Sequence, residues 1–360
     1  MEMNICINAP TSTKLHLGKE KKALGGADRT LLEMCYILKE EGHEVTLYTN
    51  CSKPEMSKGK RGQLELKNQI DIYEDKKEYE TYIHYRVVSP VTIKATKYVF
   101  YSQDTAETPC FKGLEKEGDV WFTQFDLIVA LSHFHKDNMK TYLPIKDIPF
   151  QIMGNFSYPN FTVQKEKLYI YCSTPYRGLR LLPAIWRRIL KKDPEARLEV
   201  YSSMSIYGNP MIDSMYFSSL YEQLQKLPNC KYSTSIAHKK LQDRLAKAYL
   251  LLYPNTYPET FCNVINEARA NSTPFITSDL GALKETGGGA GMYVTPQASE
   301  SQYIAEFMRA YDFLQDNYLD YQRDCKYFRT RREYAKDIRK VVKLPREDEY
   351  YYGRVPIEEK

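Results

Sequence analysis

Tyr257-Pro-Glu-Thr-Phe-Cys-Asn-Val-Ile-Asn-Glu267 is the stretch that says most about the fold, because two carboxylates, Glu259 and Glu267, bracket an expected helix start. A Pro-Glu turn opens the segment, and apolar residues recur at positions 261, 264, 265 and 268, the spacing of one helical face. We therefore predict a helix over residues 259–267. The first amides of a helix have no partner within it and favour an anion; here they belong to Phe261, Cys262 and Asn263.

The spacing of the two carboxylates suits a nucleotide sugar. Glu267 lies seven residues beyond Thr260, which is about 10 Å along a helix axis at roughly 1.5 Å per residue. A diphosphate at the helix N-terminus would leave ribose hydroxyls within reach of Glu267 and the sugar near Glu259. Either acid alone would fit a helix-dipole or surface role. The pair, set inside Pro-Glu-Thr-Phe, favours a functional site.

Outward from this stretch, strands and helices alternate along the chain, an order that predicts parallel sheets. In the first half we expect a helix over 27–41, ended by Gly42, and strands over 3–9, 45–48, 84–88, 97–101, 127–131 and 150–153. In the second half we expect helices over 178–190, 211–224, 239–248 and 259–267, and strands over 168–172, 197–201, 230–232, 249–253 and 274–277. A polar segment, 155–165, separates the two series.

This order predicts an α/β fold of two Rossmann-like domains with parallel sheets facing a central cleft. In such sheets ligands bind outside the carboxyl ends of the strands. We place the N-terminal domain at residues 1–158 and the C-terminal domain at 159–324. The chain is expected to be helical from about residue 299. We expect residues 325–360 to pack back on the first domain as a helical tail, with a charged surface extension over 343–360.

Composition narrows the class of protein. The 360 residues are 42% hydrophobic and 27% charged, as in soluble globular proteins, and no apolar run approaches the ~20 residues that span a bilayer. The first residues lack the basic and apolar regions of a secretion signal, so we expect a cytoplasmic protein. Eight cysteines without a Cys-x-x-Cys pair indicate free thiols. The net charge of +5 suits an anionic donor or acceptor, a peripheral membrane contact or a polyanion.

A glycine pair, Gly25-Gly26, opens the first long helix. Glycine lets the backbone approach a diphosphate or sugar closely, beside a helix end that favours negative charge. A tight turn without a ligand is the other interpretation; the position after the first strand favours binding. The preceding loop, residues 10–26, carries four lysines, Lys14, Lys19, Lys21 and Lys22. We expect the loop either to contact phosphate through these lysines or to lie in solvent as a lid.

Three segments together resemble family 4 of the retaining glycosyltransferases, which have the two-domain GT-B fold. They are Leu24-Gly-Gly-Ala-Asp-Arg-Thr-Leu-Leu-Glu33 with Glu41-Gly-His-Glu-Val45, Ser173-Thr-Pro-Tyr-Arg-Gly-Leu179, and Tyr257 to Glu267 extended through Thr277-Ser-Asp-Leu-Gly-Ala-Leu-Lys-Glu285. The last segment has the family's Glu-x7-Glu spacing, and the three run in the family's order. The resemblance is specific for fold and donor class and does not specify the acceptor.

The resemblance implies transfer of a hexose or pentose from a nucleotide diphosphate sugar, of the UDP-glucose type, with retention at the anomeric carbon and without a metal or cofactor. It implies that Arg177 neutralises the donor phosphates, that Glu259 contacts the donor sugar and that Glu267 binds the ribose. The catalytic candidates are Arg177, Glu259 and Asp104. The donor site comprises Gly25, Gly26, Arg177, Glu259, Thr260, Phe261, Cys262, Asn263 and Glu267.

Many relatives carry a second phosphate cation near the position of Arg177. Here Arg180 is the nearest further cation. If Arg180 points to solvent, the second charge is expected from Lys239 or Lys240.

Sugar and acceptor contacts are expected from the first domain. Many relatives have a histidine where this chain has Gln103, and glutamine can bond a hydroxyl but cannot act as an acid or base. Asp104 follows it as a candidate for sugar or acceptor hydroxyls. His133 and His135, which come after the strand at 127–131, are acceptor-side candidates.

Several acceptors and one inactive alternative stay open at this point. A glycan or a lipid is the commonest choice of the family, and a hydroxylated base in nucleic acid suits the basic charge. A catalytically inactive nucleotide-sugar-binding module is favoured by Gln103 and by the single phosphate cation. A dinucleotide-dependent dehydrogenase is poorly supported, because no Gly-x-Gly-x-x-Gly follows the first strand.

Overall fold

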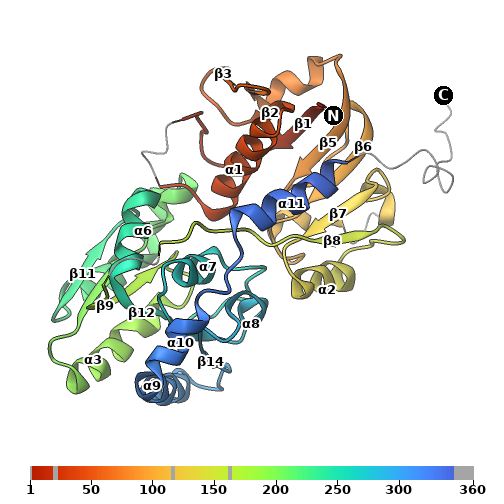
Figure 1. The fold of residues 1–360 in the computed structure, drawn as a ribbon. Helices are drawn as coiled ribbons and strands as arrows, with labels where there is room; N and C mark the ends of the chain where they lie inside the picture. The colour runs from red at the N-terminus through yellow and green to blue at the C-terminus, as the bar shows by residue number, and fades with distance from the viewer. Residues whose placement is uncertain (1, 19–22, 115–117, 161–163, 344–360) are drawn as a thin grey trace.

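The computed structural model describes residues 2–18, 23–114, 118–160 and 164–343, and these form two sheets with helices packed around them (Figure 1). The first sheet has the strand order β3-β4-β2-β1-β5-β6-β7-β8; β3 is antiparallel to β4 and the other neighbours are parallel. Its strands are β1 Asn4–Ala9, β2 Glu44–Thr49, β3 Glu55–Lys58, β4 Gln63–Asn68, β5 Glu78–Tyr85, β6 Lys94–Tyr101, β7 Leu127–Ala130 and β8 Phe150–Ile152.

The second sheet is parallel throughout, with the order β11-β10-β9-β12-β13-β14. Its strands are β9 Glu166–Cys172, β10 Arg197–Tyr201, β11 Cys230–Ser233, β12 Ala248–Tyr253, β13 Phe275–Ser278 and β14 Gly291–Val294. Its central strands are nearly continuous apolar runs, as expected of strands covered by helices on both faces. We call the parts built on the two sheets the first and second domains.

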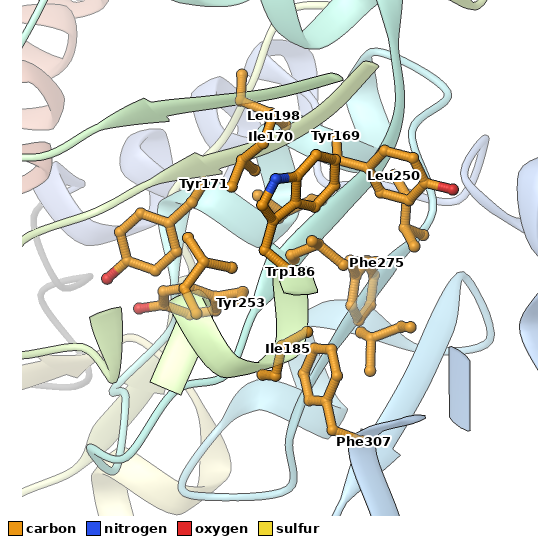
Figure 2. Packing of buried hydrophobic residues seen from close by; sticks show 14 of the residues in the cluster. Tyr169, Ile170, Tyr171, Ile185, Trp186, Leu198, Leu250, Tyr253, Phe275 and Phe307 are labelled. Atoms are coloured by element: carbon orange, nitrogen blue, oxygen red, sulfur yellow. The ribbon is translucent and has the colours of Figure 1, made fainter. Parts of the chain in front are cut away.

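Helices α1 Gly26–Glu40 and α2 His133–Tyr142 belong to the first domain. The helices of the second domain are α3 Leu182–Lys192, α4 Pro210–Ile212, α5 Ser218–Gln225, α6 His238–Lys247, α7 Asn263–Ala270, α8 Leu283–Gly287, α9 Glu300–Asp316 and α10 Tyr318–Asp324. Trp186 of α3 is fully buried among strand side chains such as Tyr169 and Leu250 (Figure 2). This core fixes the second sheet, whose carboxyl edge forms one wall of the site described below.

The last described helix, α11 Arg331–Val342, returns to the first domain (Figure 1). Tyr334 and Ile338 are fully buried in the same hydrophobic cluster as Leu31 of α1. A capping box at Thr330 and Glu333 starts the helix. The expected domain limits stay predictions. From residue 344 onward the charged extension expected over 343–360 lies outside the described residues, as do Lys19, Lys21 and Lys22 of the 10–26 loop.

Several predicted elements differ from the structure. The strand predicted over 84–88 is β5 Glu78–Tyr85, which ends where Arg86 adopts a left-handed backbone with φ 76°. Strands β3 and β4 were not predicted, because both are short and rich in polar and charged residues, which is the composition of a loop. Strand β3 is at the edge of the sheet and β4 lies between β3 and β2. The helix predicted over 211–224 is broken by a π-helical turn, Asp213–Phe217, between α4 and α5.

Replacement of Ile338 by valine tests the packing of α11. Removing one methylene from a filled core position is expected to lower the free energy of unfolding by about 0.5–1.5 kcal/mol, measured by urea denaturation followed by circular dichroism. Lys336 is exposed on the same helix, so Lys336→Ala is the control and should change stability by less than about 0.5 kcal/mol. Equal stability of Ile338→Val and wild type would contradict the packing described.

Candidate functional site

A cleft with a volume of about 240 Å³ lies between the two domains. Residues of the first domain that line it follow β1, β5, β6, β7 and β8, and those of the second domain end or follow β9, β10, β11 and β12. The cleft is thus formed at the carboxyl ends of both sets of parallel strands, where open α/β sheets bind ligands.

Arg177 enters the cleft from the turn after β9. Its Nε donates to Glu259 Oε1 at 2.8 Å, and its guanidinium lies 3.7 Å from the ring centroid of Tyr257. The next residue, Gly178, has φ 80°, and a Cβ there would lie 1.8 Å from the carbonyl oxygen of Pro254. Only glycine fits this turn, so the turn fixes Arg177 beside Glu259.

The helix predicted over 259–267 begins later in the structure. α7 starts at Asn263, and Cys262 precedes it with φ 75°, so Glu259 stands in a loop rather than on the helix. We call residues 259–262 the donor loop, after the expected role. The axial estimate of about 10 Å between Thr260 and Glu267 does not hold, because Thr260 lies outside the helix.

Phe261 is also placed differently from the prediction. Ile265 and Ala268 are buried in the core of the second domain, as the helical spacing predicts, whereas Phe261 packs into the core of the first domain with Leu131 and Met153. Gly154 makes room for its ring, since a Cβ there would lie 2.4 Å from Phe261 Cε2. The donor loop is therefore packed against both domains.

Thr260 connects the donor loop to the first domain through two buried hydrogen bonds. Its Oγ1 donates to the carbonyl of Gln103 at 2.9 Å, and its own carbonyl accepts from Ser132 Oγ at 2.7 Å. Asn263, the first residue of α7, accepts a hydrogen bond from Asn155 Nδ2 at 3.0 Å. These bonds hold the N-terminus of α7 at the edge of the cleft.

Glu267 is buried on α7 and forms an ion pair across the cleft with Arg29 of α1. His238 Nε2 lies 3.2 Å from the same carboxylate oxygen. Burial raises the pKa of Glu267, but the charge of Arg29, the charge of His238 at the low pH where it is protonated, and hydrogen bonds from Arg29 and Gln242 together outweigh it and leave this pKa below the ordinary value. Burial also lowers the pKa of His238 to about 4. Glu267 is therefore ionised and His238 neutral near pH 7.

The second cation does not come from the expected residues. Arg180 pairs with Glu300 at the surface, and Lys239 and Lys240 are not among the residues that line the cleft. Among the described residues that line the cleft, the other arginines besides Arg177 are Arg29 and Arg86, both from the first domain. They were missed because they lie far from Arg177 in sequence, although Arg29 belongs to the Gly-Gly-Ala-Asp-Arg motif.

Asp104 and Gln103 both line the cleft, as predicted. Asp104 forms a bidentate ion pair with Arg86, at 2.5 Å from Nε and 3.2 Å from Nη2. Gln103 is buried, and its Nε2 has no partner within the described part of the chain. An unsatisfied buried amide is costly, so Gln103 has a donor available for a ligand oxygen.

The two histidines predicted on the acceptor side do not line the cleft. The ring of His135 is buried, with Nδ1 accepting from the N–H of Leu131 and Nε2 near the carbonyl of Asp104. Burial lowers its pKa to about 4, so it is a neutral structural residue. His133 uses its backbone N–H to bond Glu285 across the domain boundary.

The glycine pair lies at the start of α1, as predicted. A Cβ on Gly26 would lie 2.3 Å from Asn263 Nδ2, and a Cβ on Gly25 would lie 2.9 Å from Tyr207 Cε1. Both contacts cross the cleft. Because neither glycine has a side chain, Asn263 and Tyr207 of the second domain can approach the backbone of the first domain here. This packing role is separate from the expected role in ligand binding.

Further residues that line the cleft were not predicted as site residues. They include Tyr207, His238, Tyr253 and Tyr257. Tyr253 donates to Glu259 Oε1 at 2.7 Å, so Glu259 is held by both Arg177 and Tyr253. Tyrosines are so frequent in this sequence, with 31 copies, that composition alone does not single these out.

Within residues 2–18, 23–114, 118–160 and 164–343, no group of three His, Cys, Asp or Glu side chains is arranged to hold a metal ion. The helices in the same ranges include none that is both long and apolar enough to cross a bilayer.

Comparison with known proteins identifies the fold. Residues 168–312, in the second domain, match the family model described as Glycosyl transferases group 1. No curated protein matches the sequence. A sucrose-phosphate synthase from Thermosynechococcus elongatus is similar in structure, with a TM-score of 0.67 at 12% identity over 94% of this chain and 98% of that one.

Two further structures agree with this match. HepE from Anabaena, solved with UDP and glucose, gives a TM-score of 0.66 at 13% identity over 95% of this chain and 99% of that one. A trehalose 6-phosphate synthase from Burkholderia multivorans gives 0.62 at 10% identity over 95% and 98%. The chain has the GT-B fold, as the sequence predicted, and the family match supports a glycosyltransferase.

Proposed function

We propose that the protein is a retaining, metal-independent glycosyltransferase that moves a hexose or pentose from a UDP-sugar, of the UDP-glucose type, to a hydroxyl of a glycan or lipid. The observation that carries this proposal is that Arg177, Glu259, Glu267 and the N-terminus of α7 line one interdomain cleft. The similarity to HepE, whose structure contains UDP and glucose, supports the choice of donor.

In the proposed complex the diphosphate lies between Arg177 and the first amides of α7. Arg177 uses Nε for Glu259, and an arginine has further N–H donors at its terminal nitrogens for phosphate oxygens. The α7 amides add the partial positive charge of a helix N-terminus. Ribose hydroxyls would bond Glu267, whose lowered pKa keeps it an acceptor. Glu259 would bond hydroxyls of the sugar.

In the proposed reaction these residues act mainly by stabilising charge. As the glycosidic bond breaks, negative charge develops on the leaving diphosphate, and donors that are already in place stabilise it in a site with little water. We propose attack from the face that the diphosphate leaves, with a phosphate oxygen taking the proton of the acceptor hydroxyl. No protein general base is assigned. His238 is the histidine among the described residues that line the cleft, and it lies beside Glu267 rather than beside Glu259, where the sugar is expected.

Replacing Tyr253 by phenylalanine tests the position of Glu259. Burial raises the pKa of Tyr253 well above its ordinary value, so the hydroxyl stays a donor to Glu259. A hydrogen bond to a charged group contributes about 1.5 kcal/mol or more, and its loss should lower kcat/KM about tenfold. Tyr249→Phe, which removes a hydroxyl bonded to Gln315, is the control. Equal effects of both variants would contradict the proposed role.

The experiment that tests the function is a thermal-shift screen against UDP, GDP, ADP and dTDP and their sugars. A ligand of the folded state raises Tm by mass action. A shift with UDP-sugars, followed by detection of transfer to a glycan or lipid acceptor, supports the proposal. UDP binding without transfer to any acceptor, with slow hydrolysis absent as well, indicates the inactive module. Transfer to hydroxylated bases in DNA indicates the nucleic-acid alternative. No shift with any nucleotide refutes the donor site.

A further inference from the structure

Glu285, on α8 of the second domain, reaches the first domain. Its two carboxylate oxygens accept hydrogen bonds from the backbone N–H groups of His133, at 2.9 Å, and Phe134, at 2.8 Å. These are the first two residues of α2. A side chain of one domain thus caps a helix of the other.

The cap completes the N-terminus of α2. The first N–H groups of a helix have no partner within it and favour a negative charge. The third amide, that of His135, is bonded by Ser132 Oγ at 2.9 Å, and Glu285 satisfies the two before it. Without Glu285, the first domain would offer these two amides to water.

The same short helix, α8, holds the donor loop. The N–H of Ala282 donates to the carbonyl of Glu259 at 2.8 Å. Gly281, with φ 62°, permits this approach, since a Cβ there would lie 2.5 Å from the same carbonyl oxygen. Thr286 Oγ1 donates to the carbonyl of Phe261. Glu285 therefore stands between two residues that bind the backbone of the donor loop.

A third contact joins the start of α2 to the donor loop, so that α2, the donor loop and α8 are each bonded to the other two. Ser132, immediately before α2, donates from Oγ to the carbonyl of Thr260 at 2.7 Å. The start of α2 is thus bonded to the donor loop directly, and to α8 through Glu285. A change in the distance between the domains must break both bonds, so the position of the donor loop and the closure of the cleft are linked.

We propose that Glu285 is a positioning residue, which holds the first domain closed on the donor loop and so sets Glu259 and Arg177 opposite the acceptor. The inference rests on the proposed function and adds a residue to it. Glu285 is exposed, so its two hydrogen bonds break without leaving a buried charge. Such a contact suits a cleft that must open to release product and close again for each turnover.

The test compares Glu285→Ala, Glu285→Gln and Glu285→Asp with wild type. Glu306→Gln is the matched control, because it removes the charge of a partly exposed acid of the same domain that pairs with Arg309. The radius of gyration of the full chain, from small-angle X-ray scattering with and without UDP, reports closure independently of turnover. The Kd for UDP and the kcat and KM with a UDP-sugar report on the site. Tm checks that each variant is folded.

We expect Glu285→Ala to have a larger radius of gyration than wild type and a kcat lowered about tenfold, since a charge and two hydrogen bonds at a helix N-terminus are lost. Glu285→Gln loses the charge and one of the two acceptors, and we expect changes in the same direction. The Kd for UDP should change less than about twofold, because Arg177, Glu267 and the first amides of α7, which carry most of the expected nucleotide contacts, lie in the second domain. Glu285→Asp keeps the charge and should recover part of kcat. Glu306→Gln should behave as wild type.

An unchanged radius of gyration together with an unchanged kcat in Glu285→Ala would overturn the inference while leaving the proposed function intact. The same holds if Glu306→Gln lowers kcat as much as Glu285→Ala does. If wild type binds no nucleotide, the proposed function fails and the positioning role fails with it. A larger radius of gyration in Glu285→Ala would then still identify the interdomain cap.

Discussion

Replacing Arg177 by alanine is expected to lower kcat/KM for sugar transfer by about 10²–10³. Arg177 is the second-domain cation of the described cleft lining, and it is fixed beside Glu259 by a turn that only glycine fits. Removing one preorganised donor to a developing negative charge costs about this much in other active sites. The variant also leaves the Glu259 carboxylate without its cation, which adds to the loss. Steady-state kinetics with a UDP-sugar measure the effect.

Arg180→Ala is the matched control for this prediction. Arg180 lies three residues further along the chain but pairs with Glu300 at the surface, where ion pairs contribute little. We expect its kcat/KM to stay within about twofold of wild type. If Arg177→Ala retained wild-type turnover, or if Arg180→Ala lost as much, the proposed phosphate contact would be wrong.

Replacing Glu267 by alanine is expected to weaken UDP binding about hundredfold, which is about 2.7 kcal/mol. The loss has two sources: the hydrogen bonds that the carboxylate would make to ribose, and the charge of Arg29, which loses its partner. Isothermal titration calorimetry measures the Kd. The Tm increase that UDP causes in wild type should be largely lost in the variant.

Glu267→Gln separates these two sources, since it keeps the shape and one acceptor but removes the charge. We expect it to bind UDP more weakly than wild type and more tightly than Glu267→Ala. Glu300→Ala serves as the control, because Glu300 forms an exposed pair with Arg180 away from the cleft. UDP binding unaffected by Glu267→Ala would remove the ribose site from the proposal.

Part of the site could be predicted because its residues lie close together in sequence. Glu259, Glu267 and the N-terminus of α7 come from one segment, and Arg177 follows a recognisable strand and glycine turn. The structure brings all of them to one cleft. Their place at the carboxyl ends of strands follows from the alternation of strands and helices, which local periodicity shows.

Other features depend on contacts between distant segments. Phe261 has the spacing of a helical core residue, yet it fills a space in the other domain beside Gly154. Arg29 and Arg86 pair with carboxylates that lie 238 and 18 residues away. A one-dimensional pattern gives no information on such pairs, because they form only in the folded chain. The Arg29–Glu267 pair needs the two domains to come together, and the Arg86–Asp104 pair needs β5 and β6 to lie side by side.

The parallel α/β architecture, the interdomain cleft and the segment with Glu259 and Glu267 can be predicted from the sequence, since they depend on hydrophobic periodicity and on short motifs. Three features are defined by the folded molecule alone: which arginine faces which carboxylate, where α7 begins, and that Glu285 caps a helix of the other domain. The physical reason is that ion pairs, caps and buried rings take their energy from neighbours in space. Those neighbours are set by packing within and between the domains rather than by position along the chain.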